Sequence, residues 1–181
     1  YPCLPWLFIG HYTISLLLTN VNMLQLHISD HAPEFSLPDD AGVMHTLKDY
    51  RGQWVILYFY PKDDTPGCTT EACSFRDNLP KFKKMDVVVI GVSIDSPKKH
   101  TKFKEKFELP FTLLSDEKKE VVNLYGVWAK KKFMGREHMG ILRTSFLIDP
   151  KGKIAKVYEN VKPAEHVAEV MGDLQELRSA K

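Results

Sequence analysis

The sequence predicts an α/β domain in which helices cover a central sheet. Two apolar runs, residues 54–60 and 86–95, hardly alternate with polar residues, which is typical of strands buried on both faces. A segment with the apolar spacing of an amphipathic helix follows each run. Two more strands and a final helix complete the order near the C-terminus. Strands that alternate with helices in this way fold into packed layers.

The composition fits one globular domain. The chain has 181 residues, of which 44% are hydrophobic and 27% charged, so it can bury a sizeable core. The formal net charge of +2 favours no nucleic-acid or acidic partner. A lysine-rich stretch at residues 98–108 contains glutamates, which indicates a solvated helix face instead of a nucleic-acid contact.

The first 22 residues differ in composition from the rest. They contain no Asp, Glu, Lys or Arg, and their apolar residues are interrupted too often to predict a membrane span. They also lack the basic start of a secretory signal, and the first methionine is Met23. We therefore expect residues 1–22 to be a non-native leader, with a presequence remnant as the alternative, and residues 23–181 to form the domain. The expected location is cytoplasmic, or organellar if the leader is a presequence.

The first strands are predicted from short apolar pieces. Alternating segments between residues 31 and 52, with turn residues at 38–42, predict a β-hairpin at the edge of the domain. Residues 54–60 follow and are expected to form the central strand of the sheet.

A long helix is expected next, over residues 67–85. Phe75, Leu79 and Phe82 recur at helical spacing and mark its buried face. Pro80 lies within this helix and is expected to kink it or end it early, because proline has no N–H to donate.

The second strand, residues 86–95, is followed by a clear helix start. Ser96 is a favourable cap and Pro97 is suited to the first turn. Phe103 and Phe107 mark the buried stripe of this helix, while its lysines face water.

A third strand and a short helix come next. Residues 111–114 form the predicted strand, and Ser115 and Asp116 are expected to cap the helix. The basic segment at residues 128–139 is expected to be a loop near the reactive site.

The C-terminal part predicts a hairpin and a helix. Residues 143–149 and 153–158 form the expected strands, joined by a Pro-Lys-Gly turn. Residues 163–178 carry an apolar stripe that predicts a helix packed against the core.

Cys68 lies where the central strand leads into the long helix. A thiolate at a helix N-terminus faces unpaired backbone N–H groups and the positive end of the helix dipole, which can bring a cysteine pKa down to roughly 3.5 to 7.5. The thiolate is the nucleophilic form of cysteine, so this position predicts a reactive residue.

Cys73 follows five residues later in the same helix. On a regular helix this spacing separates the Cα atoms by about 7.5 Å and turns the side chains roughly 140° apart, whereas a disulfide needs Cα atoms within about 7 Å. The two cysteines can therefore pair only if the first turns of the helix unwind. The alternative is that both are small buried residues of an amphipathic helix.

These residues carry a resemblance to a known family. The pattern Pro61-x-x-x-Thr65-x-x-Cys68 resembles the active-site signature of the peroxiredoxins, and Cys73 is similar in position to the resolving cysteine of the peroxiredoxin Q group, also called bacterioferritin comigratory protein. The resemblance extends from about Leu26 to the C-terminus and includes residues 32–39, 75–77 and 143–149. It implies a thioredoxin-like fold of the peroxiredoxin type, with a central mixed sheet flanked by helices and an N-terminal β-hairpin.

The resemblance also implies roles for single residues. Cys68 would be the peroxidatic cysteine, whose thiolate attacks a peroxide oxygen. Arg143 would hold the thiolate and the peroxide together, because its five donors are always charged. Thr65 offers a hydroxyl to the peroxide, Pro61 forms a wall that limits water, and Glu71 orients the arginine and so contributes to substrate binding.

The implied enzyme is an atypical two-cysteine, thioredoxin-dependent peroxiredoxin that reduces hydrogen peroxide and organic hydroperoxides. Its Cys68 sulfenic acid would condense with Cys73 to an intramolecular disulfide, which thioredoxin or a similar dithiol reduces. We expect a monomer without cofactor, metal, membrane or nucleic-acid partner. The alternative is a peroxide-sensing redox switch or interaction module that uses the same two cysteines without efficient turnover.

Overall fold

The computed structural model describes residues 26–133 and 135–179. The expectations for the leader at residues 1–22 and for the domain start at residue 23 lie outside these residues. No helix within the described ranges is long and apolar enough to cross a membrane.

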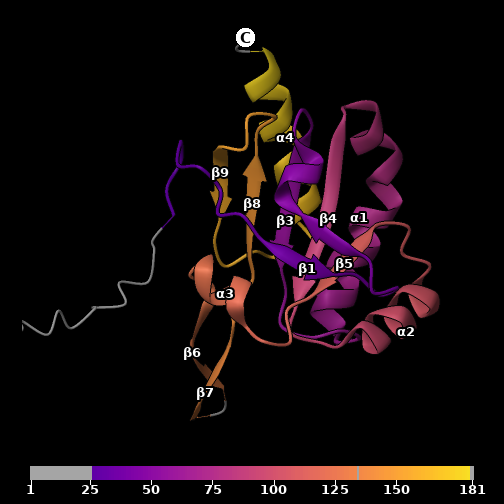
Figure 1. The fold of residues 1–181 in the computed structure, drawn as a ribbon, viewed down its shortest axis with the longest axis vertical. Helices are drawn as coiled ribbons and strands as arrows, with labels where there is room; N and C mark the ends of the chain where they lie inside the picture. The colour runs from indigo at the N-terminus through magenta and orange to yellow at the C-terminus, as the bar shows by residue number, and fades with distance from the viewer. Residues whose placement is uncertain (1–25, 134, 180–181) are drawn as a thin grey trace, which may run out of the picture.

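A five-stranded mixed sheet forms the centre of the domain, with the strand order β5-β4-β3-β8-β9 (Figure 1). β3 (Trp54–Phe59) is parallel to β4 (Val87–Ser93), which is parallel to β5 (Thr112–Ser115). On its other side β3 is antiparallel to β8 (Thr144–Ile148), which pairs with β9 (Ile154–Tyr158). All six residues of β3 are buried, which confirms it as the central strand.

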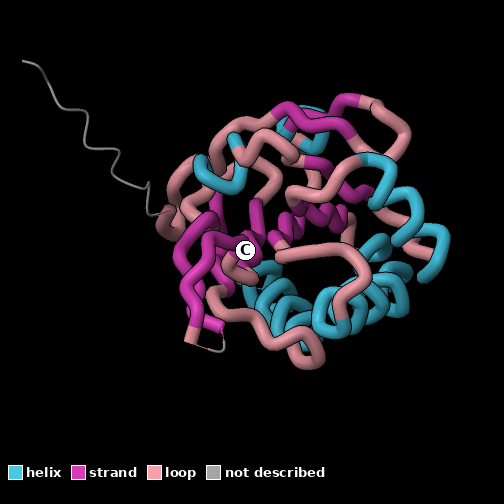
Figure 2. Tube along the Cα trace, turned by 90° about the horizontal axis from the view of Figure 1, so that it is seen from below, coloured by secondary structure: helices cyan, strands magenta, loops and turns pink. Residues whose placement is uncertain are grey.

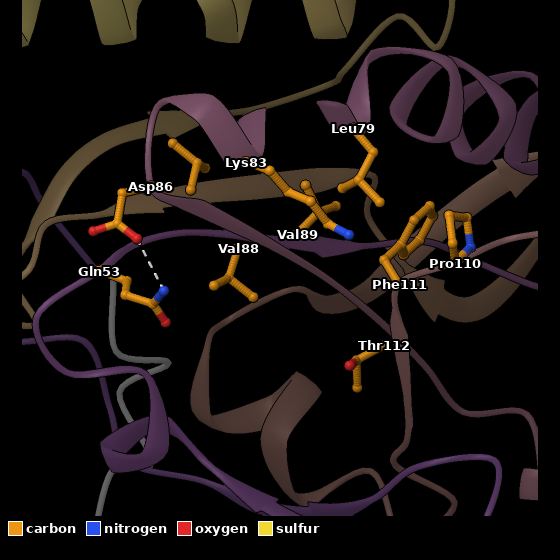
Figure 3. A pocket seen from close by; sticks show the side chains of 10 residues that line it. Gln53, Leu79, Lys83, Asp86, Val88, Val89, Pro110, Phe111 and Thr112 are labelled. Atoms are coloured by element: carbon orange, nitrogen blue, oxygen red, sulfur yellow. Dashed lines mark hydrogen bonds between the residues drawn. The ribbon is translucent and has the colours of Figure 1, made fainter. Parts of the chain in front are cut away.

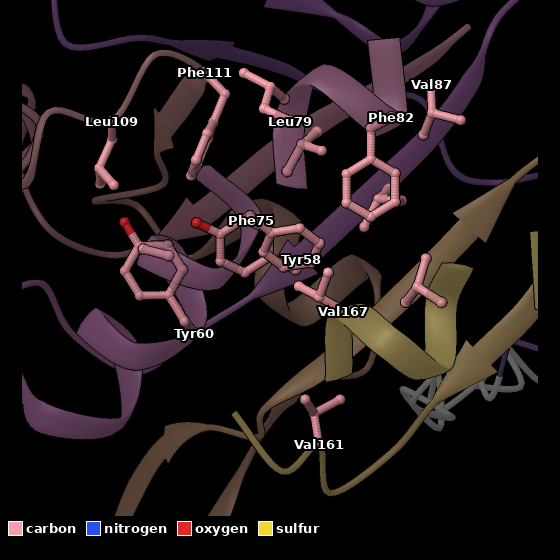
Figure 4. Close-up of a cluster of buried hydrophobic side chains, with 14 of the residues drawn as sticks. Tyr58, Tyr60, Phe75, Leu79, Phe82, Val87, Leu109, Phe111, Val161 and Val167 are labelled. Atoms are coloured by element: carbon pink, nitrogen blue, oxygen red, sulfur yellow. The ribbon is translucent and has the colours of Figure 1, made fainter. Parts of the chain in front are cut away.

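The longer helices gather on one side of this sheet (Figure 2). α1 (Pro66–Lys84), α2 (Pro97–Phe107) and α4 (His166–Ser179) pack on the same cluster of buried side chains. Figure 4 shows aromatic rings of β3 and α1 in this cluster, among them Tyr58, Phe75 and Phe82. The elements therefore form the layered α/β arrangement predicted from the sequence.

The opposite face of the sheet is covered by smaller elements. β1 (Ser36–Pro38) and β2 (Met44–Thr46) form the expected N-terminal hairpin, which is followed by the short 3-10 helix η1 (Leu47–Tyr50). A second cluster of buried apolar side chains lies between these elements and the sheet, and α3 (Glu120–Leu124) contributes Val121 and Val122 to it. The Asp116 carboxylate accepts hydrogen bonds from the backbone N–H groups of α3 at Glu120 and Val122, at 3.0 and 2.8 Å. Asp116 thus satisfies N–H groups of the first turn as expected of a capping side chain, although Lys119 occupies the N-cap position and Ser115 ends β5.

The early end of the helix at Pro80 and the loop at residues 128–139 were wrong expectations. α1 continues through Pro80 to Lys84, because Leu79 and Phe82 on either side of the proline are buried in the core while Pro80 faces solvent. Residues 128–139 do not form a loop: β6 (Trp128–Phe133) and β7 (Arg136–Ile141) pair as an antiparallel hairpin. Lysine-rich strands lack the apolar alternation that identifies a strand in the sequence.

Candidate active site

Cys68 lies in the first turn of α1, where the carboxyl end of β3 leads into the helix. Thr65 is the N-cap residue in an extended conformation, and Pro66 occupies the first helical position. Both residue types favour a helix start, so the local sequence fixes where α1 begins. Cys68 is 2% exposed and is not in a disulfide. Its sulfur therefore sits near the unpaired N–H groups of the first turn, in a site that excludes most water.

Arg143 reaches Cys68 from the segment between β7 and β8. Its Nη2 lies 3.2 Å from the Cys68 Sγ, and its Nη1 donates a hydrogen bond to the Glu71 carboxylate. The guanidinium thus contacts the sulfur and the Glu71 carboxylate through two different nitrogens. A Cβ atom on Gly67 would lie only 3.3 Å from the Arg143 Nη2, so glycine leaves the space that the arginine occupies.

Glu71 is completely buried behind the arginine. Burial raises its pKa to about 7, although the charge and hydrogen bond of Arg143 oppose this rise. One carboxylate oxygen bonds to Arg143, and the other is buried without a hydrogen-bond partner in the described part of the chain. The carboxylate therefore holds one edge of the guanidinium while the other edge faces the sulfur.

Pro61 and Thr65 lie in the loop between β3 and α1. The Thr65 hydroxyl donates to the Lys62 carbonyl at 3.1 Å, and the Thr65 carbonyl accepts the Thr69 N–H at 2.8 Å. The structure thus brings Cys68, Arg143 and Glu71 into direct contact, and it places Pro61 and Thr65 on the loop that precedes the cysteine. No direct hydrogen bond from Thr65 to the sulfur is present among the described atoms.

Cys73 remains in helical conformation on the same helix. It is half-buried and unpaired, and α1 is continuous from Pro66 to Lys84. The prediction that the two cysteines cannot bridge an intact helix agrees with this arrangement.

Asp63 is a further buried residue of this loop that the sequence patterns did not reveal. Its carboxylate accepts the Tyr60 hydroxyl at 2.7 Å and lies 2.8 Å from Nδ1 of His100, on α2. Its backbone N–H donates to the Asp95 carboxylate at 2.8 Å. The loop that presents Thr65 and Cys68 is therefore held by β3, by α2 and by the segment after β4.

Lys131 was also missed. It extends from β6, and its Nζ donates to the Ile141 carbonyl at 2.9 Å, two residues before Arg143. Burial lowers its pKa, and the positive charge of Arg143 lowers the pKa further. The repeated lysines of β6 gave no signal that this one points toward the site.

One pocket lies apart from these residues. It has a volume of about 300 Å³ and is found near the amino ends of β3 and β4, whereas Cys68 follows the carboxyl end of β3. Gln53, Val88 and Phe111 are among its lining residues (Figure 3), and it includes none of the predicted site residues. Among the residues that the structure describes, no group of three or more His, Cys, Asp or Glu side chains is placed to hold a metal ion.

Comparisons with known proteins agree with this geometry. The AhpC/TSA family profile matches residues 28–157. Peroxiredoxin Bcp of Bacillus subtilis is 48% identical over 154 residues, which are 85% of this chain and 98% of that protein. Peroxiredoxin Bcp of Escherichia coli is 49% identical over 154 residues, 85% of this chain and 99% of its own length.

Solved structures give the same result. A structure of Xanthomonas campestris peroxiredoxin Q superimposes with a TM-score of 0.74 at 37% identity and covers 78% of this chain and 90% of its own. A mutant PrxQ from Xylella fastidiosa gives a TM-score of 0.79 at 35% identity, and the match covers 86% of this chain and 98% of the Xylella chain. The thioredoxin-like fold of the peroxiredoxins is therefore confirmed. The chain belongs to the AhpC/TSA family, in the Bcp and peroxiredoxin Q group of peroxiredoxins, which are thiol-dependent peroxidases.

Proposed function

We propose that this peroxidase reduces hydrogen peroxide and organic hydroperoxides with Cys68 as the peroxidatic cysteine. The observation that carries the proposal is the contact between the Arg143 guanidinium and the buried Cys68 sulfur, at 3.2 Å in the first turn of α1. Helix N–H groups and a fixed cation both favour the thiolate, which is the attacking species. A structure of the Xanthomonas campestris bacterioferritin comigratory protein, 37% identical to this chain, concerns the alkyl peroxide reduction activity of that protein, which supports organic hydroperoxides as substrates here.

The attack transfers one oxygen to sulfur. The Cys68 thiolate donates its electron pair to the nearer peroxide oxygen, the O–O bond breaks, and the leaving hydroxide or alkoxide takes up a proton to become water or alcohol. Arg143 stabilises the negative charge as it moves from sulfur to the leaving oxygen. Thr65 offers its hydroxyl to the incoming peroxide, and Pro61 restricts water because it carries no N–H. The product on Cys68 is a sulfenic acid.

Glu71 acts through Arg143 in this proposal. Its hydrogen bond to Nη1 fixes the orientation of the guanidinium, so that Nη2 is directed at the sulfur. Because the pKa of Glu71 is raised to about 7, the carboxyl is part-protonated near neutral pH and adds less negative charge beside the thiolate. Glu71 thus supports substrate binding without contacting the peroxide.

Cys73 resolves the sulfenic acid. Its thiol displaces the Cys68 oxygen, which leaves as water while the S–S bond forms. We propose that thioredoxin or a similar dithiol then reduces this intramolecular disulfide and that the enzyme works as a monomer, since both cysteines belong to one chain.

The test is a peptide map of the reduced protein after one equivalent of peroxide, made in parallel on Cys68→Ser and Cys73→Ser. We expect the parent to lose two hydrogens in a Cys68–Cys73 bridge, and Cys73→Ser to retain an oxidised Cys68. If Cys68 stays reduced while Cys73 is oxidised, the assignment is wrong. Continuous peroxide consumption with thioredoxin would distinguish the enzyme from a redox switch that is oxidised once.

A further inference from the structure

Arg76 connects the cysteine-bearing part of α1 to the end of α2. It lies three residues after Cys73, and its side chain is 31% exposed. Its Nη1 donates a hydrogen bond of 2.7 Å to the backbone carbonyl of Phe107, the last residue of α2, and its Nε donates to Asp77 at 2.8 Å. The last carbonyls of a helix lack partners within the helix, so Arg76 caps α2 while it links the two helices.

The position of Arg76 along α1 matters because part of this helix must open. Cys68 and Cys73 can pair only if the turn between them leaves the helical conformation. In an α-helix the N–H groups of residues 72–76 donate to the carbonyls of residues 68–72. Arg76 is therefore the last residue whose amide bonds back into the turn that opens.

Pro80 removes one backbone hydrogen bond of α1 at Arg76. Proline has no N–H, so the carbonyl of Arg76 receives no hydrogen bond from the residue four positions later. Beyond this gap, Leu79 and Phe82 are buried and hold the second half of α1 in the core. At the far edge of the turn that opens, Phe75 is buried and stacks on Tyr58, and the hydrogen bond from Arg76 to Phe107 ties this edge to α2.

The near edge, where the loop before Cys68 leads into α1, is held by a buried polar network. Asp63 is 8% exposed and bonded to Tyr60, His100 and Asp95, as described above. Opening that begins at this edge would disrupt a buried polar network. Opening that begins at the far edge breaks the backbone hydrogen bonds of the turn and, in addition, the partly exposed side-chain hydrogen bond from Arg76 to Phe107.

We propose that the hydrogen bond between Arg76 and Phe107 is a latch that sets how fast α1 opens for disulfide formation. This inference rests on the proposed function, in which Cys73 resolves the Cys68 sulfenic acid. Arg76 is then a positioning residue for resolution: while the latch is closed, the sulfenic acid waits at Cys68, and a second peroxide can convert it to sulfinic acid. When the latch opens, the Cys73 thiol attacks the Cys68 sulfur, the S–S bond forms, and the sulfenic oxygen leaves as water.

A competing role for Arg76 predicts the opposite sign. The guanidinium lies within electrostatic reach of Cys73, and a positive charge favours the thiolate that attacks. If that were its main effect, removal of the charge would slow disulfide formation. Removal of a latch accelerates it.

The experiment measures the two steps separately in rapid mixing with hydrogen peroxide, with thiol-trapping and mass analysis. For Arg76→Met we expect disulfide formation to be about 3- to 10-fold faster, as for the loss of one partly exposed hydrogen bond from a charged donor. The rate of Cys68 oxidation should stay within about 2-fold of the parent, and more peroxide should be needed to form sulfinic acid. Arg76→Lys keeps the charge but loses the planar fork, so a smaller acceleration is expected. It also provides a second variant if Arg76→Met does not fold.

Arg178→Met is the matched control. Arg178 also donates to a backbone carbonyl, that of Met85 just after α1, but at the far end of the helix. We expect its disulfide formation to match the parent. Equal acceleration in both methionine variants, or no acceleration in the folded Arg76 variants, would overturn the latch. A parent protein that forms no Cys68–Cys73 disulfide would instead remove the proposed function, and the latch with it.

Discussion

The two cysteines of α1 are five residues apart but lie in different surroundings. Cys68 is 2% exposed, is contacted by the Arg143 guanidinium, and follows a loop held by Asp63. Cys73 is half-buried, and the turn that carries it is held at its far edge through Arg76. Attack on a peroxide needs groups held in a fixed geometry, whereas resolution needs one cysteine to move. A single helix provides both, because Cys68 lies in a fixed site at its start while Cys73 lies on a half-buried turn that can leave the helical conformation.

The largest effect is expected for Arg143, which contacts Cys68. Arg143→Met should lower the rate of Cys68 oxidation by about 10²- to 10³-fold, the typical cost of losing one donor that stabilises developing charge. The measurement is rapid-mixing kinetics of the first oxidation step at several peroxide concentrations. Disulfide formation after that step should change much less, because Arg143 does not contact Cys73.

Arg143→Lys separates charge from geometry. Lysine keeps the positive charge but cannot bond to Glu71 and the sulfur through two edges of one planar group. We expect it to recover only part of the lost rate. Full recovery would show that a point charge is sufficient and that the orientation given by Glu71 has no role.

The next effect concerns His166 and Glu71, two buried side chains whose pKa values are shifted in opposite directions. Burial lowers the pKa of His166 from 6.5 to about 4, with a further contribution from Arg143. Its neutral form is therefore favoured in the folded state, and stability is lost as the pH falls from 6.5 to about 4. Burial raises the pKa of Glu71 from 4.5 to about 7, so its protonated form is favoured and stability is lost as the pH rises through this range.

These two contributions oppose each other between pH 4.5 and 6.5. Glu71→Gln should expose the His166 contribution: the free energy of unfolding of this variant is expected to fall by roughly 2–3 kcal/mol more than that of the parent as the pH drops over this range. Urea unfolding at several pH values measures it. An equal slope for the variant and the parent would mean that folding does not raise the pKa of Glu71.

A smaller effect tests the loop before Cys68. Asp63→Ala removes the partner of Tyr60 and His100 and should lower the free energy of unfolding by about 1–3 kcal/mol, because buried donors lose their acceptor. It should also slow Cys68 oxidation, since the loop then presents the cysteine less uniformly. Both are measured on the same preparation, by urea unfolding and rapid mixing.

Asp64→Asn provides the control at the next position. Asp64 bonds Lys106 at the surface, with 49% and 58% of the two side chains exposed, and such pairs contribute at most about 1 kcal/mol. Asparagine also tolerates the positive φ of 55° at this residue. If this variant slows Cys68 oxidation as much as Asp63→Ala, the buried network is not what holds the loop.

Local features of the sequence predicted much of the fold. The apolar run at residues 54–60 identified the central strand, and Ser96 with Pro97 identified the start of α2. These predictions succeed because burial on both faces and helix capping depend on residues close together in the chain. They fail where packing from elsewhere decides, as at Pro80, where buried neighbours keep the helix intact.

The active site shows the same division. The sequence by itself determined that Cys68 begins a helix after a buried strand, and that Cys73 cannot reach it while that helix is intact. The family resemblance named Arg143 and Glu71 as partners of Cys68, but only the tertiary structure gave the contact of Arg143 with the sulfur, 75 residues away, the complete burial of Glu71, and the bond from Arg76 to the end of α2. The reason is physical: the charge that surrounds a thiol and the contacts that hold a helix turn come from segments distant in sequence, and they meet only when the sheet and helices pack.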